Sequence, residues 1–477
     1  MNIRLGVPAA RCNHRAPKPL PAFARDVTGA AYRSGQTRTE VIMGDATDTG
    51  AMSIEGRTIQ KVRNRILPFI FVLYIVAFLD RINIGFAALT MNRELAITSQ
   101  QFGLLTGIFF VGYFLFEIPS NLLLHKIGAR VWIARILLTW GAVAVLTGFV
   151  QGVHQLYVVR FLLGLAEAGF APGMLLYLTY WFRQQDRARS VGLYLAGMPV
   201  ASLLGGPVSG LILDHIHWLG VSSWRWLLVL EGVPAIFCGL FTYFLLPSRP
   251  EEAKFLTGEE KRWIATELAR EEQGKLAQEQ YSTLQALMNG RVWRLAAIYF
   301  GLLIGLYALT FWGPQLIRSL SNGYSSSTVG FLVMIPSLAG VAGMILISRN
   351  SDRTLERRYH VAIPAFLGGV ALLLLGTTHS PAISVLLLSF LAIGVYGIMG
   401  PFWALPSEFL TGFSAAAGLA LINAAGNLGG FVGPLVIGSI TQRTGSLYGG
   451  LSLAGLSMFA SATLVLLLPR ASHAPAD

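Results

Sequence analysis

The chain has 477 residues, of which 54% are hydrophobic and 13% are charged, and its formal net charge is +12. A soluble domain is about 25% charged, so this composition excludes a soluble enzyme or a disordered chain and indicates an integral membrane protein. The basic residues fall between apolar runs, so we expect a lipid bilayer and no nucleic acid as their partner. Two cysteines exclude a disulfide scaffold and a cysteine-based zinc site.

Twelve apolar runs are long enough to cross a membrane as helices, which takes roughly 20 residues for ~30 Å of hydrocarbon. Barrel strands would instead appear as ~10-residue segments of alternating polarity. The sequence therefore predicts an all-α integral membrane protein with twelve transmembrane helices. The expected spans are 66–89, 101–124, 132–150, 154–177, 189–213, 224–247, 294–317, 329–348, 361–378, 382–405, 413–440 and 447–469.

The N-terminal segment, residues 1–60, contains no long apolar core, so we expect a disordered tail without a cleavable secretory signal. Its alternatives are an Arg-rich organelle leader or a chain that naturally starts at Met43 or Met52. The long polar stretch 248–292 opens with a capping-box pattern at Thr257-Gly-Glu-Glu260 and predicts a cytoplasmic helical linker.

The linker divides the spans six and six, and a shift of 227 residues lays the first set onto the second. Lys126 then falls on Arg353, and Gly206-Pro207 falls on Gly433-Pro434. Two parallel six-helix halves with a site between them near the midplane are the architecture of major facilitator transporters. The expected parts are the tail 1–60, the first half 61–247, the linker 248–292, the second half 293–470 and a C-terminal tail 471–477.

The distribution of Lys and Arg over short loops predicts the orientation of the spans. One set of loops carries ten basic residues and the other carries four, so we expect both termini and the linker in the cytoplasm. The protein itself is expected to be a multi-pass protein of the cell membrane, which in a bacterium is the inner membrane. The ten are Lys126, Arg130, Arg135, Arg183, Arg187, Arg189, Arg349, Arg353, Arg357 and Arg358, and the four are Arg93, Arg225, Arg318 and Arg443.

Ionisable side chains inside membrane spans are costly and mark function by default. All of them lie in the first half, whereas the second half offers aromatic and amide groups. The charged residues are Asp80, Arg81, Glu117, Arg160, Glu167 and Glu231, and the uncharged candidates are Tyr307, Trp312, Tyr396, Trp403, Asn423 and Asn427. For Glu117 and Glu231 we favour a structural role between helices.

Counted from the expected span ends, Asp80 and Arg160 lie at one depth, which allows them to pair, and Glu167 lies two turns deeper than Arg160 on the same face. A guanidinium binds a carboxylate bidentately, and a carboxylate that gains and loses an Arg partner can load and release a proton. We therefore expect Asp80 and Glu167 to carry coupling protons, and Arg81 or Arg160 to hold an anionic substrate. The alternative is a static charge network that locks helices together.

Five segments together resemble the anion:cation symporter family of the major facilitator superfamily, over about residues 60–470. They are Phe78-Leu-Asp-Arg-Ile-Asn-Ile-Gly-Phe86, Glu117-Ile-Pro-Ser-Asn-Leu122 continuing through His125-Lys-Ile-Gly-Ala-Arg130, Arg160-Phe-Leu-Leu-Gly-Leu-Ala-Glu-Ala-Gly-Phe170, Trp224-Arg225-Trp226 with Glu231-Gly232, and Ser351-Asp-Arg353. The resemblance implies proton-driven uptake of organic acids, such as hexonates, tartrate-like dicarboxylates or aromatic acids, by rocking of two halves.

The resemblance also implies roles for individual residues. Asp80 and Glu167 would be the protonatable groups, and Arg81 and Arg160 their partners or the substrate ligands. Further polar contacts in the cavity would come from Tyr113, Trp403 and Asn423, and the cytoplasmic loop motifs from Lys126, Arg130, Asp352 and Arg353. Two departures, Met198 in place of an amide and Phe78 in place of a Tyr, favour a cargo with fewer hydroxyl groups than a hexonate.

The same residues are compatible with other functions. An exchanger or a uniporter for the same anions would use the same residues, and a membrane sensor would bind them without transport. A membrane enzyme would need a nucleophile–base set or a metal cluster, and the sequence contains neither a GxSxG nor an HExxH pattern. We expect no cofactor and no metal, a proton as coupling ion, and a monomer.

Overall fold

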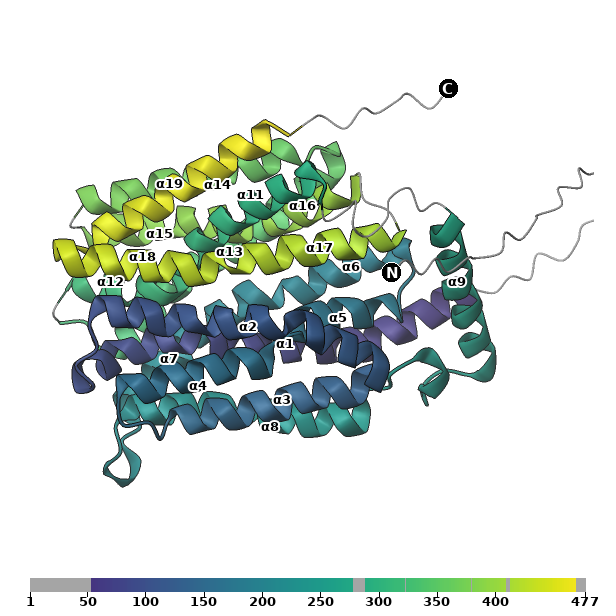
Figure 1. Ribbon diagram of the computed structural model, residues 1–477, viewed down its shortest axis with the longest axis horizontal. Coiled ribbons are helices and arrows are strands. Elements are labelled where there is room, and N and C mark those ends of the chain that lie inside the picture. The colour runs from purple at the N-terminus through teal and green to yellow at the C-terminus, as the bar shows by residue number, and fades with distance from the viewer. Residues whose placement is uncertain (1–52, 278–287, 322, 379, 409–411, 469–477) are drawn as a thin grey trace, which may run out of the picture. The chain divides into compact units, whose positions relative to one another are not determined.

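The computed structural model describes residues 53–277, 288–321, 323–378, 380–408 and 412–468. Within these residues twelve helices are long and apolar enough to cross a membrane, which confirms the expected all-α fold. Figure 1 shows them running side by side, with helix α9 (Gly258–Ala277) across one end of the helices. We call this the α9 end and the other the opposite end. The expected C-terminal tail and most of the N-terminal tail lie outside the described residues.

The first half contains six spans, two of which are interrupted. Thr98 caps α2 with Gln101 in a reciprocal capping box, and Gly169, at φ 83°, breaks the fourth span between α4 and α5. The helices are α1 (Ile54–Glu94), α2 (Ser99–Ile127), α3 (Ala129–Thr147), α4 (Val153–Glu167), α5 (Phe170–Thr179), α6 (Gln184–Leu195), α7 (Gly197–His215), the short η1 (Trp218–Gly220) and α8 (Ser223–Leu245).

The second half repeats this plan, and its first span contains a π-helical segment, a local widening that is frequent at functional sites. The elements are α11 (Gly290–Tyr307), η3 (Ala308–Trp312), α12 (Gly313–Ser319), α13 (Ser326–Thr354), α14 (Arg358–Leu374), η4 (Leu375–Thr377), α15 (Pro381–Tyr396), α16 (Met399–Ala404), η5 (Leu405–Glu408), α17 (Gly412–Asn427), α18 (Gly429–Thr444) and α19 (Leu447–Leu466).

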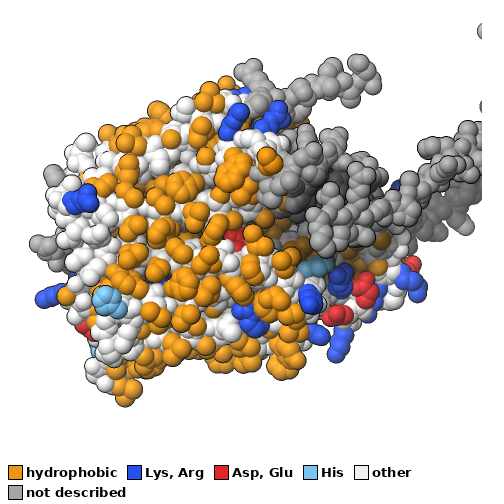
Figure 2. Space-filling view, in the orientation of Figure 1, with side chains coloured by type: hydrophobic (Ala, Val, Ile, Leu, Met, Phe, Trp, Pro, Cys, Tyr) orange, Lys and Arg blue, Asp and Glu red, His pale blue; other side chains and the backbone are white. Residues whose placement is uncertain are grey.

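The linker contains η2 (Pro250–Glu252) and α9, which begins with the expected capping box. The Glu260 N–H lies 3.3 Å from the Thr257 hydroxyl, and the Thr257 N–H lies 2.9 Å from the Glu260 carboxylate. Lys61 of α1 contacts the same carboxylate at 2.8 Å. Burial opposes ionisation of Glu260, but Lys61 and Thr257 together lower its pKa. Figure 2 shows acidic and basic side chains gathered around α9, beside a mostly apolar face.

The two halves approach each other closely at the opposite end, where α7 packs on α13 and α2 packs on α18. A Cβ at Gly210 would lie 2.9 Å from the Ser327 Cα, so the approach requires a glycine there. The Asp214 carboxylate accepts hydrogen bonds from the Ser326 N–H at 3.0 Å and the Ser327 N–H at 2.7 Å. A side chain of the first half therefore caps a helix of the second.

Candidate functional site

We call Asp80, Arg81, Arg160 and Glu167 the charged cluster. An ion pair between Arg81 of α1 and Glu167 of α4 is its centre. Glu167 is the last residue of α4, directly before the break at Gly169, and it is fully buried. The Arg81 side chain is 11% exposed. Removing one member of such a buried pair leaves an uncompensated charge. One carboxylate oxygen of Glu167, Oε2, has no hydrogen-bond partner, so the pair has room for another donor.

The aromatic ring of Phe109 in α2 holds two guanidinium groups. Arg81 lies 5.3 Å and Arg160 lies 5.4 Å from the ring centroid, distances at which a cation is attracted to the ring. Arg81 also lies 5.5 Å from the ring of Tyr113. Arg160 is 1% exposed, and its Nε and Nη2 atoms have no hydrogen-bond partner. A buried donor without a partner is costly, so Arg160 is suited to receive an anion.

Asp80 does not pair with Arg160. It accepts hydrogen bonds from the Trp140 indole N–H at 2.7 Å and from the Asn83 amide at 3.3 Å, and it has no ion pair among the described residues. Counting from helix ends does not give relative depths, because the ends of neighbouring helices are not level. Trp140 lies ~10 Å from the end of α3, yet it contacts Asp80, which lies ~21 Å from the end of α1.

Three further expected site residues lie on both halves. Tyr113 is buried beside Arg81. Asn423 of α17 donates a hydrogen bond of 2.6 Å to Glu117 of α2, so Glu117 connects two halves rather than two helices of one half. Trp403 is half-buried and makes an edge contact of 5.1 Å with the ring of Tyr299. The structure thus brings Tyr113 to the charged cluster and places Asn423 at the boundary between the halves.

A small cavity also lies at this boundary. Its lining includes Ser202 and Tyr396, whose hydroxyl groups are 2.8 Å apart across the halves, together with apolar side chains such as Ile82 and Phe86. None of the four charged residues of the cluster lines it. The charged cluster, rather than this cavity, is therefore the candidate site.

The loop motifs lie at the α9 end. Lys126 and Arg130 are exposed and make no ion pair among the described residues, and the Arg130 N–H donates to the Ser248 hydroxyl at 3.2 Å. In the second half, Asp352 pairs with Arg357 at 2.6 Å, while Arg353 is exposed. The loop motifs are therefore separate from the charged cluster.

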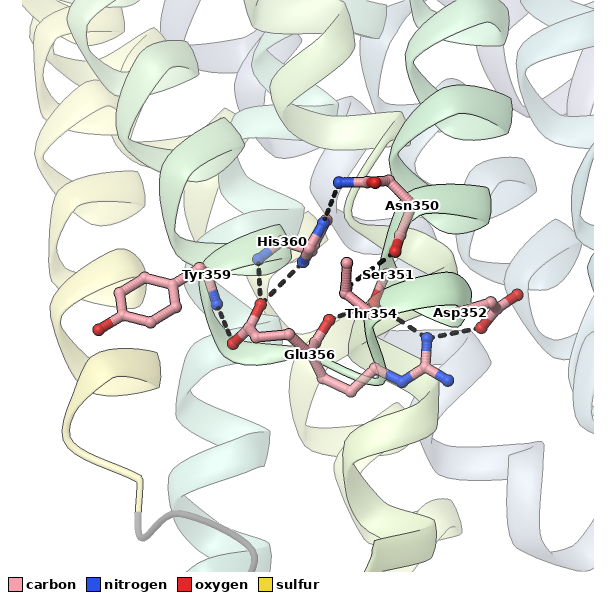
Figure 3. Close-up of polar contacts among 8 residues, drawn as sticks. Asn350, Ser351, Asp352, Thr354, Glu356, Tyr359 and His360 are labelled. Atoms are coloured by element: carbon pink, nitrogen blue, oxygen red, sulfur yellow. Dashed lines mark hydrogen bonds and ion pairs between the residues drawn. The ribbon is translucent and has the colours of Figure 1, made fainter.

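Glu356 fixes the turn that follows Asp352 (Figure 3). It accepts the N–H groups of Tyr359 and His360 at the start of α14, and its Oε2 lies 2.8 Å from the His360 ring. Burial opposes ionisation of Glu356, but the Tyr359 N–H, the His360 ring and the His360 N–H lower its pKa.

Sequence reasoning missed Trp140 and Phe109, which hold Asp80 and the two arginines. Both are aromatic residues in strongly apolar spans, where a ring is ordinarily packing. The signal that was available is the indole N–H of Trp140, because a buried Trp usually finds a hydrogen-bond acceptor. Among the described residues, no group of three or more His, Cys, Asp or Glu could hold a metal ion.

The two arginines of the charged cluster can exchange the Glu167 carboxylate for the carboxylate of a bound molecule. A substrate carboxylate entering beside Arg81 and Arg160 would compete with Glu167 for the guanidinium groups, and a displaced Glu167 favours its protonated form.

Comparison with known proteins adds the family. The model described as "Major Facilitator Superfamily" matches residues 70–434. A protein of Agrobacterium vitis named "Putative tartrate transporter" is 45% identical over 88% of this chain and 93% of its own. The "Quinolone resistance transporter" of Acinetobacter baumannii is 40% identical over 85% and 94%. An inward-facing, unoccupied bacterial homologue of the human lysosomal transporter Spinster shares the fold, with a TM-score of 0.62 at 19% identity over 85% and 95% of the two chains.

Proposed function

The chain belongs to the Major Facilitator Superfamily and is a multi-pass membrane transport protein rather than an enzyme, and on this premise we propose that it takes up a small organic anion together with protons. The expected cargo is a carboxylate such as a tartrate-like dicarboxylate, a sugar acid or an aromatic acid. The relative named as a tartrate transporter supports this class.

The observation that carries the proposal is the buried Arg81–Glu167 pair beside Arg160. Two guanidinium groups in an apolar interior need anionic partners, and this cluster supplies a single carboxylate that pairs with one of them. A substrate carboxylate completes the set. Its bidentate binding to a guanidinium would release Glu167 from Arg81.

Proton coupling follows from what a released carboxylate does. Glu167 without Arg81, or Asp80 without its hydrogen-bond donors, is a buried charge and takes up a proton. Loss of the substrate restores the ion pair and expels the proton. Asp80 and Glu167 are the proposed proton carriers, and the proton is the coupling ion.

The two halves would rock to expose this cluster to one side of the membrane at a time. The close approach at the opposite end, through Gly210 and Asp214, supports a state that is open toward the α9 end. The basic loops support a cytoplasmic α9 end, and we propose that both termini are cytoplasmic. We propose a monomer in the cell membrane, which in a bacterium is the inner membrane.

The test is uptake by vesicles that contain the purified protein. The substrates are radiolabelled tartrate, gluconate and benzoate, with a labelled quinolone as a separate arm because one relative is named for quinolone resistance. An inward proton gradient should drive accumulation of one of the acids, and Asp80→Asn and Glu167→Gln should abolish it. Glu94→Gln, which neutralises a carboxylate near the end of α1, is the control.

Three outcomes would contradict the proposal. Exchange of internal for external acid without any response to the gradient identifies an exchanger, and passive equilibration identifies a uniporter. Transport of the quinolone and of none of the acids would show that the cargo is not an organic acid.

A further inference from the structure

Glu231 in α8 is a buried carboxyl group that the mechanism above does not use. Its Oε1 accepts a hydrogen bond of 2.7 Å from the Ser209 hydroxyl of α7, and its Oε2 has no partner. Arg225, six residues earlier in α8, lies 3.5 Å from Glu94. Glu231 therefore has no cation to offset an ionised carboxylate.

Asn83 of α1 lies between Glu231 and Asp80. Its amide N–H donates to Asp80 at 3.3 Å, and its carbonyl oxygen Oδ1 is buried without a hydrogen-bond donor. Helix α1, which carries Asn83 and Asp80, packs on α8, which carries Glu231. Glu231 lies ~12 Å from the start of α8, and Asn83 and Asp80 lie ~16 Å and ~21 Å from the end of α1.

Glu231 makes no ion pair among the described residues, and its Oε2 has no hydrogen-bond partner. Three helices pack on α8: α1, α3 and α7. Helix α1 contributes Asp80 and Asn83, α7 contributes the neutral Ser209, and α3 presents Ala144 to the neighbouring Gly232. Two buried carboxylates that share this region cannot both be ionised without repulsion.

A proton on Glu231 Oε2 would remove a buried charge that has no cation beside it. An ionised carboxylate only accepts hydrogen bonds, whereas a protonated one also donates. On the adjacent helix α1, Asn83 Oδ1 is a buried acceptor without a donor. Asp80, by contrast, has donors at both oxygens, Trp140 and Asn83, which suits the ionised form.

We propose that Glu231 is a third proton site, which holds a proton while Asp80 is ionised and exchanges it with Asp80 during transport. The O–H bond at Glu231 breaks as a water molecule takes the proton, and the O–H bond at Asp80 forms as water delivers it, so the pair keeps one proton and one negative charge. Asn83 positions the two carboxyl groups. This inference rests on the proposed proton-coupled transport, and it places the entry side of the proton path at the opposite end of the molecule.

The first test detects the proton directly. Infrared spectra of the purified full-length protein in lipid at neutral pH should contain a carboxylic-acid C=O band that disappears in Glu231→Gln. Gln reproduces the shape of the protonated acid and keeps an oxygen that can accept from Ser209, so the variant is expected to fold. Glu94→Gln, whose carboxylate accepts from Trp224 at 2.8 Å, should leave the band in place. An unchanged band in Glu231→Gln overturns the proposal, whether or not a substrate is known.

The second test separates proton transfer from structural support. In vesicles with radiolabelled tartrate, Glu231→Gln should lower gradient-driven uptake roughly a hundredfold, the lower range for loss of a positioned proton carrier, and should lower exchange without a gradient far less. Equal losses of both activities, or wild-type uptake, contradict the role of Glu231. Wild-type protein that ignores the gradient contradicts the proposed function itself, and the infrared band then still reports on Glu231.

Discussion

The two halves share one helical plan but differ in what they bury. The first half buries Asp80, Glu117, Arg160, Glu167 and Glu231, whereas the buried polar side chains described in the second half are uncharged. Two contacts between the halves follow the same division, because Asn423 donates to Glu117 and the N–H groups of Ser326 and Ser327 donate to Asp214. The halves therefore share a helical arrangement, while the buried charges described lie in the first.

The largest expected effect comes from breaking the ion pair of the first half. Arg81→Met leaves Glu167 as a buried charge without its partner, so the free energy of unfolding should fall by ~3–5 kcal/mol. Adding Glu167→Leu removes the orphaned charge and should restore most of that stability without restoring uptake. Thermal unfolding of both variants measures the two changes in stability. A double variant that is no more stable than Arg81→Met would show that the unpaired Glu167 is not the cause of the lost stability.

Removing the hydrogen bond to Asp80 should have a smaller effect. Trp140→Phe keeps a ring beside Phe170, whose centroid is 5.8 Å away, but deletes the N–H that Asp80 accepts. The expected loss of stability is ~1.5–3 kcal/mol, as for hydrogen bonds to charged groups, with reduced gradient-driven uptake. Trp181→Phe is a matched control, because the Trp181 indole nitrogen is buried without a hydrogen-bond partner. Equal losses in the two variants would refute the role of the bond.

A substitution at Asn423 in the second half should act through its hydrogen bond to Glu117 in the first half. Asn423→Ala removes the 2.6 Å hydrogen bond to Glu117, at a cost of ~1–2 kcal/mol, and should raise the KM for uptake because Asn423 is also a proposed substrate contact. Asn423→Asp should be worse than Asn423→Ala, because it places a second carboxylate against Glu117. An Asp variant as active as the wild type would show that the charge asymmetry between the halves is not required.

The smallest effect is expected at the linker. The pKa of Glu260 is lowered by Lys61 and Thr257, so its stabilising contribution is present above the ordinary pKa of a Glu, about 4.3, and is lost as the pH falls through the lowered value. The contribution should be under ~1 kcal/mol, since Lys61 is largely solvated. The protection factors of the α9 amides, which correct for the intrinsic pH dependence of exchange, should fall between pH 7 and pH 3.5, and Glu260→Gln should remove that fall.

The sequence allowed the architecture to be predicted because its signals are local. Each span is a long apolar run, and the repeat is visible in Lys126 and Arg353. The meeting of Arg81 with Glu167 rather than of Asp80 with Arg160 was not predictable, because it depends on how neighbouring helices are staggered. Trp140 and Asp80 are in contact although they lie ~10 Å and ~21 Å from the ends of their own helices. The partners Trp140 and Phe109 depend on packing across several helices.

The unpartnered nitrogens of Arg160 have a practical consequence for finding the cargo. A guanidinium that lacks acceptors in an apolar interior makes the empty carrier less stable than the loaded one, so a bound acid should raise the melting temperature with its concentration. Thermal-shift screening of detergent-solubilised protein against a library of carboxylic acids can therefore rank candidate cargoes before any vesicle is prepared. Arg160→Met should abolish the shift while leaving the ligand-free melting point at least as high.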